Sequence, residues 1–148
     1  MANEQVFHLG IKGLIRNPER KILLLKINQA ILKPDNYGEY WDIPGGRIQD
    51  GYSIEETLHR EIEEETGITD ISDISFLTSV VANIRIPVDD EGSEVGLVLY
   101  LYSVSTDTKD SEITLSEEHT EFGWFEPAEA AKRLSVKYPE RLTALITS

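Results

Sequence analysis

The first part of the chain carries two apolar patterns of the kinds that β-strands show. Residues 6–15 alternate apolar with polar or small side chains, which predicts a strand with one buried face. Residues 21–27 are almost entirely apolar, as in a short strand that is buried on both faces. Because the residues between them are typical of a turn, we expect the two strands to form a hairpin.

Further apolar segments follow in the second half of the chain. Residues 71–86 are rich in β-branched side chains and residues 95–104 are strongly apolar, so each segment predicts a strand. The polar residues 89–93 between them predict a second hairpin. A short aromatic strand is expected at residues 122–125.

Helices are predicted in three places. Ser53 and Glu56 have the spacing of a capping box and Gly67 suits a helix C-terminus, so we expect a helix between them. Residues 128–134 follow a proline and predict a short helix, and the apolar positions of residues 139–146 predict another.

The order of these elements indicates the fold class. Strands, one helix, more strands and then a helix pair predict an α/β (α+β) fold in which helices pack on a mixed sheet. At 148 residues the chain is long enough for one sizeable core, so residues 1–148 are expected to form a single domain. Residues 28–40 mix turn residues with scattered apolar ones and predict a long loop, a place where functional residues often lie.

The composition excludes several classes of function. The chain has no cysteine, which rules out disulfides, thiol nucleophiles and cysteine zinc sites. A net charge of −13 argues against bulk binding of nucleic acid or of an anionic membrane. Since no apolar stretch is long enough to span a membrane and the N-terminus lacks a signal-peptide pattern, we expect a cytoplasmic protein.

Three carboxylates gather on one side of the helix that is predicted after Ser53. At about 100° per residue, Glu61, Glu64 and Glu65 fall within one arc beside the apolar face. Their mutual repulsion is relieved by a hard divalent cation such as magnesium, or manganese in its place. Such a cation also offsets the repulsion between an acidic chain and a phosphate substrate. The alternative is an ordinary acidic helix whose glutamates face solvent.

The stretch around this helix resembles the Nudix box of the Nudix hydrolases. The family pattern is Gly, five residues, Glu, seven residues, then Arg-Glu-apolar-any-Glu-Glu-any-Gly-apolar. Gly46 and residues 60–68 meet every fixed position except the first Glu, which is Tyr52 in this chain. Residues 41–44, Trp-Asp-Ile-Pro, precede the box as they do in many members. The resemblance implies a Nudix-type α/β/α sandwich with a mixed central β-sheet.

The resemblance also implies a reaction. Nudix hydrolases cleave a nucleoside diphosphate linked to another moiety, by attack of water on phosphorus and with the help of a divalent metal. By resemblance, the metal ligands here are the carbonyl of Gly45 and the side chains of Glu61, Glu64 and Glu65. Nucleoside triphosphates, nucleotide sugars and ADP-ribose all stay open as the small-molecule substrate.

Two further catalytic roles follow from the resemblance. Arg60 is expected to orient a carboxylate of the box through a charge-assisted hydrogen bond. The general base in this family is either a box glutamate or one from a downstream loop. Glu118 fits the second description, with Glu117 and Glu121 as competitors, although a solvated acidic loop explains all three without a catalytic role.

Three residues outside the acidic helix are candidates for contacts with the substrate. Arg47 follows the glycine pair and is expected either to contact phosphate or to brace the loop by an ion pair. Arg85 either reaches a phosphate or forms a surface ion pair. Tyr37 either stacks on a nucleobase or packs against the protein, whereas nearby Trp41 is expected to pack into the core.

Tyr52 is the position at which the chain departs from the family pattern. The Glu that is usual there supports the loop and pairs with the box arginine, so its loss should loosen Arg60; the hydroxyl of Tyr52 could accept a hydrogen bond instead, and Asp50 could compensate. This departure keeps an alternative function open, a catalytically weak or inactive Nudix-fold module that binds a nucleotide or a partner. The sequence leaves open whether the chain is a monomer or a homodimer.

Overall fold

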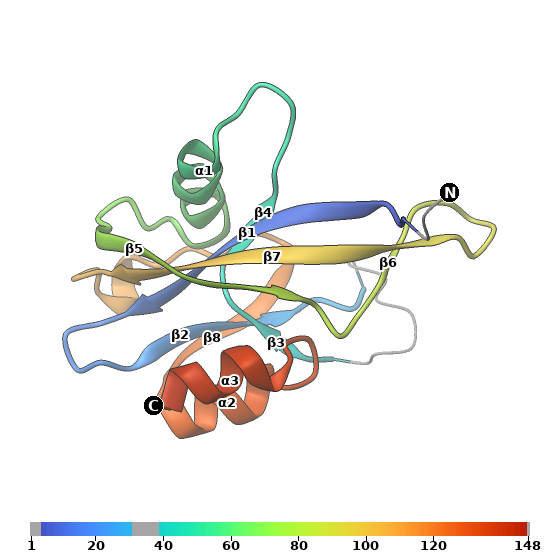
Figure 1. The fold of residues 1–148 in the computed structure, drawn as a ribbon. Helices are drawn as coiled ribbons and strands as arrows, with labels where there is room; N and C mark the ends of the chain where they lie inside the picture. The colour runs from blue at the N-terminus through green and yellow to red at the C-terminus, as the bar shows by residue number, and fades with distance from the viewer. Residues whose placement is uncertain (1–3, 31–38, 148) are drawn as a thin grey trace.

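The computed structural model describes residues 4–30 and 39–147 (Figure 1). The elements in that part of the chain are β1 (Phe7–Arg16), β2 (Ile22–Ile27), β3 (Trp41–Asp42), β4 (Gly45–Arg47), α1 (Ile54–Thr66), β5 (Ser72–Val81), β6 (Ile86–Pro87), β7 (Glu94–Ser105), the 3-10 helix η1 (Asp110–Glu112), β8 (His119–Phe125), α2 (Pro127–Leu134) and α3 (Glu140–Thr147). Every predicted strand and helix is present, with its ends shifted by a few residues.

The strands form one mixed sheet whose order is β3-β2-β1-β7-β5, with β4 also paired to β1, β8 to β2 and β6 to β7. Strands β1 and β7 run parallel, from the pair Phe7↔Gly96 to the pair Arg16↔Ser105. The other pairings are antiparallel, and they include the predicted hairpins β1–β2 and β5–β7. The parallel pair of β1 with β7 places the first strand at the centre of the sheet.

Helices cover both faces of this sheet (Figure 1). On one face, Leu58 and Ile62 of α1 pack with Ile11 and Ile15 of β1. On the other face, residues of α2 and α3 pack with β1 and β2; this core includes Leu14, Ile22, Leu24, Ala130, Leu134, Leu142 and Ile146. The predicted α/β/α sandwich with a mixed central sheet is therefore confirmed.

Helix α1 begins and ends where the sequence predicts. The hydroxyl of Ser53 accepts a hydrogen bond from the amide of Glu56 at 3.1 Å, and the Glu56 carboxylate accepts one from the amide of Ser53 at 3.0 Å. Gly67 ends the helix at φ 77°, a left-handed conformation that favours glycine, and donates its N–H to the carbonyl of Glu63. These caps set where α1 begins and ends.

One predicted strand is shorter in the structure than expected, and one candidate residue lies outside the described residues. Residues 71–86 were predicted as one strand, but β5 ends at Val81 because Asn83 turns to donate its backbone N–H to the carbonyl of Lys137 at 2.7 Å. Tyr37 lies outside the described residues, so its predicted stacking is untested. Trp41 packs against the core, with its ring 5.3 Å from that of Phe125, as predicted. None of the helices described is long and apolar enough to cross a membrane.

Candidate active site

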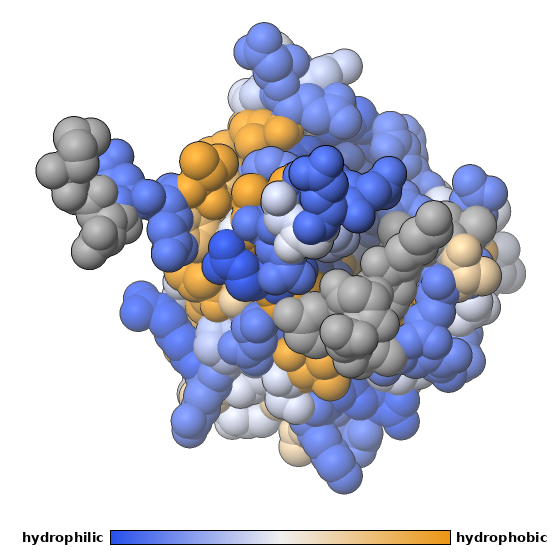
Figure 2. Space-filling model, turned by 90° about the vertical axis from the view of Figure 1, so that its right-hand side faces the viewer, coloured by the Kyte–Doolittle hydropathy of each residue, from blue (hydrophilic) through white to orange (hydrophobic). Residues whose placement is uncertain are grey.

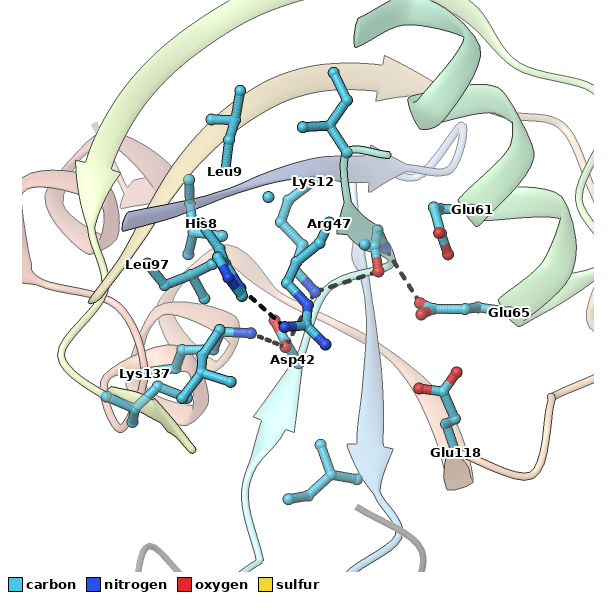
Figure 3. Close-up of a pocket in the computed structure, with 18 of the residues that line it drawn as sticks. His8, Leu9, Lys12, Asp42, Arg47, Glu61, Glu65, Leu97, Glu118 and Lys137 are labelled. Atoms are coloured by element: carbon cyan, nitrogen blue, oxygen red, sulfur yellow. Dashed lines mark hydrogen bonds and ion pairs between the residues drawn. The ribbon is translucent and has the colours of Figure 1, made fainter. Parts of the chain in front are cut away.

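A cavity of about 1040 Å³ opens between the sheet, the C-terminal half of α1 and the segment that joins α2 to α3. Glu61, Glu65 and Glu118 line one side of it, and we call these three residues the acidic wall (Figure 3). The polar residues Lys12, Asp42 and Lys137 lie together elsewhere on its lining, and we call them the cationic wall. The two walls come from different parts of the chain.

The glycine pair before α1 lets the acidic wall approach the backbone. Gly45 has φ 149°, and a Cβ there would lie 2.1 Å from the carbonyl oxygen of Ile11, so only glycine fits. Its N–H donates to Oε1 of Glu65 at 3.1 Å. A Cβ on Gly46 would lie 2.5 Å from the carboxyl carbon of Glu61. The glycines therefore let the two carboxylates lie against β4.

In the acidic wall, burial outweighs the nearby positive charges and raises the pKa of two carboxyl groups. Glu65 is buried, and burial raises the pKa of its carboxyl to about 8 even though Lys12 and the amide of Gly45 favour the charged form. Burial, together with the negative charge of Glu64, also raises the pKa of Glu61. Two carboxylates that are costly to ionise next to each other are what a bound cation would stabilise.

The other acidic candidates differ in where they point. The Glu64 side chain is 60 % exposed, lies 3.9 Å from Nε of Arg60 and is not part of the cavity lining. Glu63 is exposed, as the helical spacing predicts. Of the three loop glutamates, Glu118 lines the cavity, whereas Glu121 pairs with Lys26 at 3.5 Å. The charge of Glu118 is close enough to help raise the pKa of Glu65.

The donor atoms of the acidic wall suit a hard divalent cation. Carboxylate oxygens and the carbonyl of Gly45 are the ligand types that magnesium and manganese prefer. Among residues 4–30 and 39–147 no group of three or more His, Cys, Asp or Glu side chains is arranged to hold a metal ion. The fit to a cation thus rests on the type of the donor atoms, and Glu61 and Glu65 are the two box carboxylates that line the cavity.

The two arginine candidates lie on the cavity lining and are both paired. Nη1 of Arg47 lies 3.0 Å from Nδ1 of His8. Arg85 lies 3.9 Å from the carboxylate of Glu94 and donates to the carbonyl of that residue at 3.4 Å. Both side chains are exposed, so they can exchange these partners for a phosphate.

Comparisons with known proteins agree with the box. The family model described as NUDIX domain matches residues 6–145. The chain belongs to this family and is a Nudix hydrolase. The nucleoside triphosphatase NudI of Salmonella typhimurium is 29 % identical over 104 residues, which cover 66 % of this chain and 71 % of that protein.

Solved structures share the Nudix fold. The MutT protein of Methanosarcina mazei matches 99 % of this chain and 94 % of its own length, with a TM-score of 0.67 and 23 % identity. The E. coli dihydroneopterin triphosphate pyrophosphohydrolase matches 96 % of this chain and 95 % of its own, with a TM-score of 0.67 and 15 % identity. At these identities the likeness establishes the fold alone.

In this Nudix hydrolase the box arginine is held by the ring of Tyr52. The Arg60 guanidinium lies 4.3 Å from the ring centroid, within the range of a cation–π contact. It also donates to Oε1 of Glu61 at 3.3 Å, which fits its expected role of orienting a box carboxylate. Among the residues that the structure describes, Arg60 makes no hydrogen bond to the Tyr52 hydroxyl or to Asp50. Tyrosine thus supports Arg60 through its face.

Several residues of the site gave no signal in the sequence. Lys12, Asp42, Lys137 and Tyr138 are buried, and Asp42 accepts hydrogen bonds from the other three. His119 is also buried, and burial, aided by the charge of Lys12, lowers its pKa to about 4, so it is neutral at pH 7. These residues are scattered along the chain, and only the fold brings them together. The one hint was the position of Asp42 directly before Ile-Pro-Gly-Gly.

Proposed function

We propose that this Nudix hydrolase cleaves a nucleoside diphosphate linked to another moiety in a reaction that depends on a divalent cation. The main support is the close approach of the partly buried Glu61 and the buried Glu65 to Gly45 and Gly46 of β4, where both carboxyl pKa values are raised. The similarity to a nucleoside triphosphatase favours a nucleoside triphosphate as substrate, ahead of nucleotide sugars and ADP-ribose.

The cation proposed is magnesium, with manganese as a substitute. Its ligands would be the carbonyl of Gly45 and the carboxylates of Glu61, Glu64 and Glu65, of which Glu64 is the most exposed. When bound, the cation would neutralise charge on the phosphates and lower the pKa of a bound water. Arg60 would keep Glu61 oriented through the hydrogen bond between them.

The remaining side chains would handle the proton and the phosphates. Glu118 would accept a proton from the attacking water as its oxygen bonds to phosphorus and the anhydride P–O bond breaks. Arg47 and Arg85, on the lining of the cavity, would contact phosphate oxygens. Tyr37 stays a candidate for stacking on the base.

A direct assay tests this proposal. The wild type and Glu65→Gln would be incubated with MgCl₂ and a panel of nucleoside triphosphates, nucleotide sugars and ADP-ribose, and the products separated by ion-exchange chromatography. Glu63→Gln is the matched control, because it removes the same charge from an exposed position of the same helix. We expect Glu65→Gln to lower the rate at least about a hundredfold and Glu63→Gln to leave it within about twofold.

The outcomes separate the alternatives. If the wild type turns over no member of the panel, the protein is better described as a nucleotide-binding module. Equal rates for the wild type and Glu65→Gln would overturn the assignment of the metal ligands. Activity that survives removal of divalent cations with EDTA would overturn the metal dependence.

A further inference from the structure

The cationic wall holds more positive charge than its own carboxylate needs. Lys12 lies 3.2 Å and Lys137 lies 2.6 Å from Oδ2 of Asp42, and all three side chains are less than a tenth exposed. Two ammonium groups thus contact one carboxylate, and the charge of Glu65 also favours the charged form of both lysines. Because one lysine suffices to form the ion pair with Asp42, the place of the second on the cavity lining calls for an explanation.

The hydrogen bonds show which of the two lysines is available to a ligand. An ammonium group has three donors. Lys12 directs its ammonium to Asp42, to the carbonyl of Ile43 at 3.2 Å and to the carbonyl of Gly45 at 3.5 Å. In the part of the chain that the structure describes, Lys137 donates to Asp42 alone, so two of its N–H groups are free.

Asp42 itself has no capacity left for a ligand. Its Oδ1 accepts from the amide of Ile43 at 2.7 Å and from the hydroxyl of Tyr138, and its Oδ2 accepts from both lysines. The carboxylate therefore serves to hold Lys137 in one position. The backbone of the segment that joins α2 to α3 is held too, because the carbonyl of Lys137 accepts the N–H of Asn83.

The cavity that Lys137 lines has apolar side chains as well as the polar side chain of His8 on the same side. Ile84, Leu97 and Leu99 line the same cavity, and Lys137 and Leu97 lie on the side away from the three glutamates (Figure 3). Figure 2 looks onto the end of the molecule where β6 and the start of β1 lie, and apolar surface is visible there among polar side chains. A flat, weakly polar group fits this region better than a phosphate, which the acidic wall and its cation would hold.

We propose that Lys137 is a specificity-determining residue that donates hydrogen bonds to a carbonyl oxygen of the substrate's nucleobase. This inference rests on the proposed function, because it assumes that phosphates bind near the acidic wall. An ammonium donates and cannot accept, so at C6 of a purine or C4 of a pyrimidine it favours an oxo group over an amino group. The enzyme would prefer hypoxanthine or guanine to adenine, and uracil to cytosine.

Matched pairs of substrates test the proposal. Inosine and adenosine triphosphates differ at C6 and at the hydrogen on N1, and uridine and cytidine triphosphates differ at C4 and at the hydrogen on N3. The ratio of kcat/KM within each pair therefore reports on this edge of the base, and its change in a Lys137 variant isolates the contact. We expect the wild type to favour the oxo member of each pair about ten- to a hundredfold, the range that one charged hydrogen bond supports.

The variant Lys137→Met keeps the length of the side chain and removes its donors. We expect it to bring both ratios to within about threefold of one, by raising KM for the oxo substrates and leaving kcat nearly unchanged. Lys132→Met is the control, since Lys132 is exposed on α2 and carries the same charge. It should retain the preference of the wild type.

The outcomes distinguish a failure of this inference from a failure of the proposed function. A wild type that hydrolyses both members of each pair equally well overturns the role of Lys137, whether or not the variant folds. A variant that weakens all four substrates equally indicates a phosphate contact and overturns it too. If the wild type hydrolyses none of them, equilibrium dialysis of inosine and adenosine triphosphates still decides: equal affinities overturn the inference, and tighter binding of the oxo nucleotide that Lys137→Met abolishes supports it.

Discussion

The acidic wall and the cationic wall face the same cavity but are built in different ways. The amide of Gly45 and the carboxylate of Glu65, which hold the acidic wall together, are 20 residues apart and belong to one strand–loop–helix stretch. Lys12 and Lys137, which meet at Asp42, are 30 and 95 residues from it in sequence. One wall is thus a local structure, and the other exists only when the two ends of the chain are folded together.

The difference extends to the charge balance of the two walls. The acidic wall has carboxyl groups whose pKa values are raised, so these groups are costly to ionise where they lie. In the cationic wall, burial alone would raise the pKa of Asp42, but the charges of Lys12 and Lys137 outweigh burial and hold it well below its usual value. At neutral pH the lowered pKa of Asp42 favours folding, and the lowering of the pKa of Lys137 to about 8 by burial opposes it in part. In the acidic wall, the raised pKa of Glu65 disfavours folding at that pH.

Removing the charge of Asp42 should have the largest effect. Asp42→Asn leaves two buried ammonium groups without a counter-ion, so we expect the free energy of unfolding to fall by about 3–5 kcal/mol. Urea unfolding measures this, with Asp90→Asn as a control for the loss of an exposed carboxylate. A loss of less than about 1 kcal/mol would mean that the cationic wall does not stabilise the fold.

The pH dependence of stability should separate the two walls next. The pKa of Glu65 is about 8 in the folded protein against an ordinary value of 4.5, so without divalent cations folding favours its protonated form. The contribution of Glu65 to stability is complete below about pH 4.5 and is lost as the pH rises through 8, which amounts to a few kcal/mol.

Urea unfolding in EDTA from pH 5 to pH 9 checks this sign. The stability of the wild type should fall relative to that of Glu65→Gln as the pH rises, and magnesium should reverse the fall, because the cation binds the ionised carboxylate. Glu63→Gln, which changes an exposed glutamate, should follow the wild type at every pH. A constant difference between the wild type and Glu65→Gln would contradict the raised pKa.

A single methyl group on Gly46 should damage activity without damaging the fold. The added Cβ would lie 2.5 Å from the carboxyl carbon of Glu61, at the end of a flexible side chain that can move away. We expect Gly46→Ala to lower kcat/KM about ten- to a hundredfold with a thermal midpoint close to that of the wild type.

Gly51→Ala provides the opposite control. Gly51 has φ 88° and open space around its Cα, so alanine there should lower stability by about 1–2 kcal/mol and leave activity intact. If Gly46→Ala retains full activity, the close approach of Glu61 to the turn is not needed for the reaction.

The support of Arg60 by Tyr52 should give the smallest effect. Tyr52→Ala removes the cation–π contact, worth about 0.5–1 kcal/mol, so kcat/KM should fall only two- to fivefold or so. Tyr52→Phe keeps the ring face and should match the wild type in the same assay. Equal losses in the two variants would show that the hydroxyl, and not the ring, supports Arg60.

Much of the fold and of the acidic wall could be predicted because the signals are local. The capping box at Ser53 and the stop at Gly67 set the bounds of α1, and the helical period then places Glu61 and Glu65 beside its apolar face. The period could not show that Glu64 lies on the exposed edge, since three residues within one arc are separated only by how the helix packs on the sheet.

The cationic wall could not be predicted for a physical reason. A lysine in a strand, an aspartate before a turn and a lysine between two short helices each suit a solvent-exposed position. Their meeting depends on the pairing of β1 with β4, which sets Lys12 opposite Gly45, and on the packing of α2 and α3 against the sheet. These are long-range choices that no short stretch of sequence encodes.

By itself, the sequence determined the family, the helix that carries the carboxylates, and the glycine turn that they approach, because caps, periodicity and spacing act over a few residues. Tertiary structure alone decided which carboxylates face the cavity, that Tyr52 holds Arg60 by its ring, and that Lys137 lines the cavity beside Asp42. Those facts depend on burial and on partners far along the chain, and burial is a property of the folded molecule.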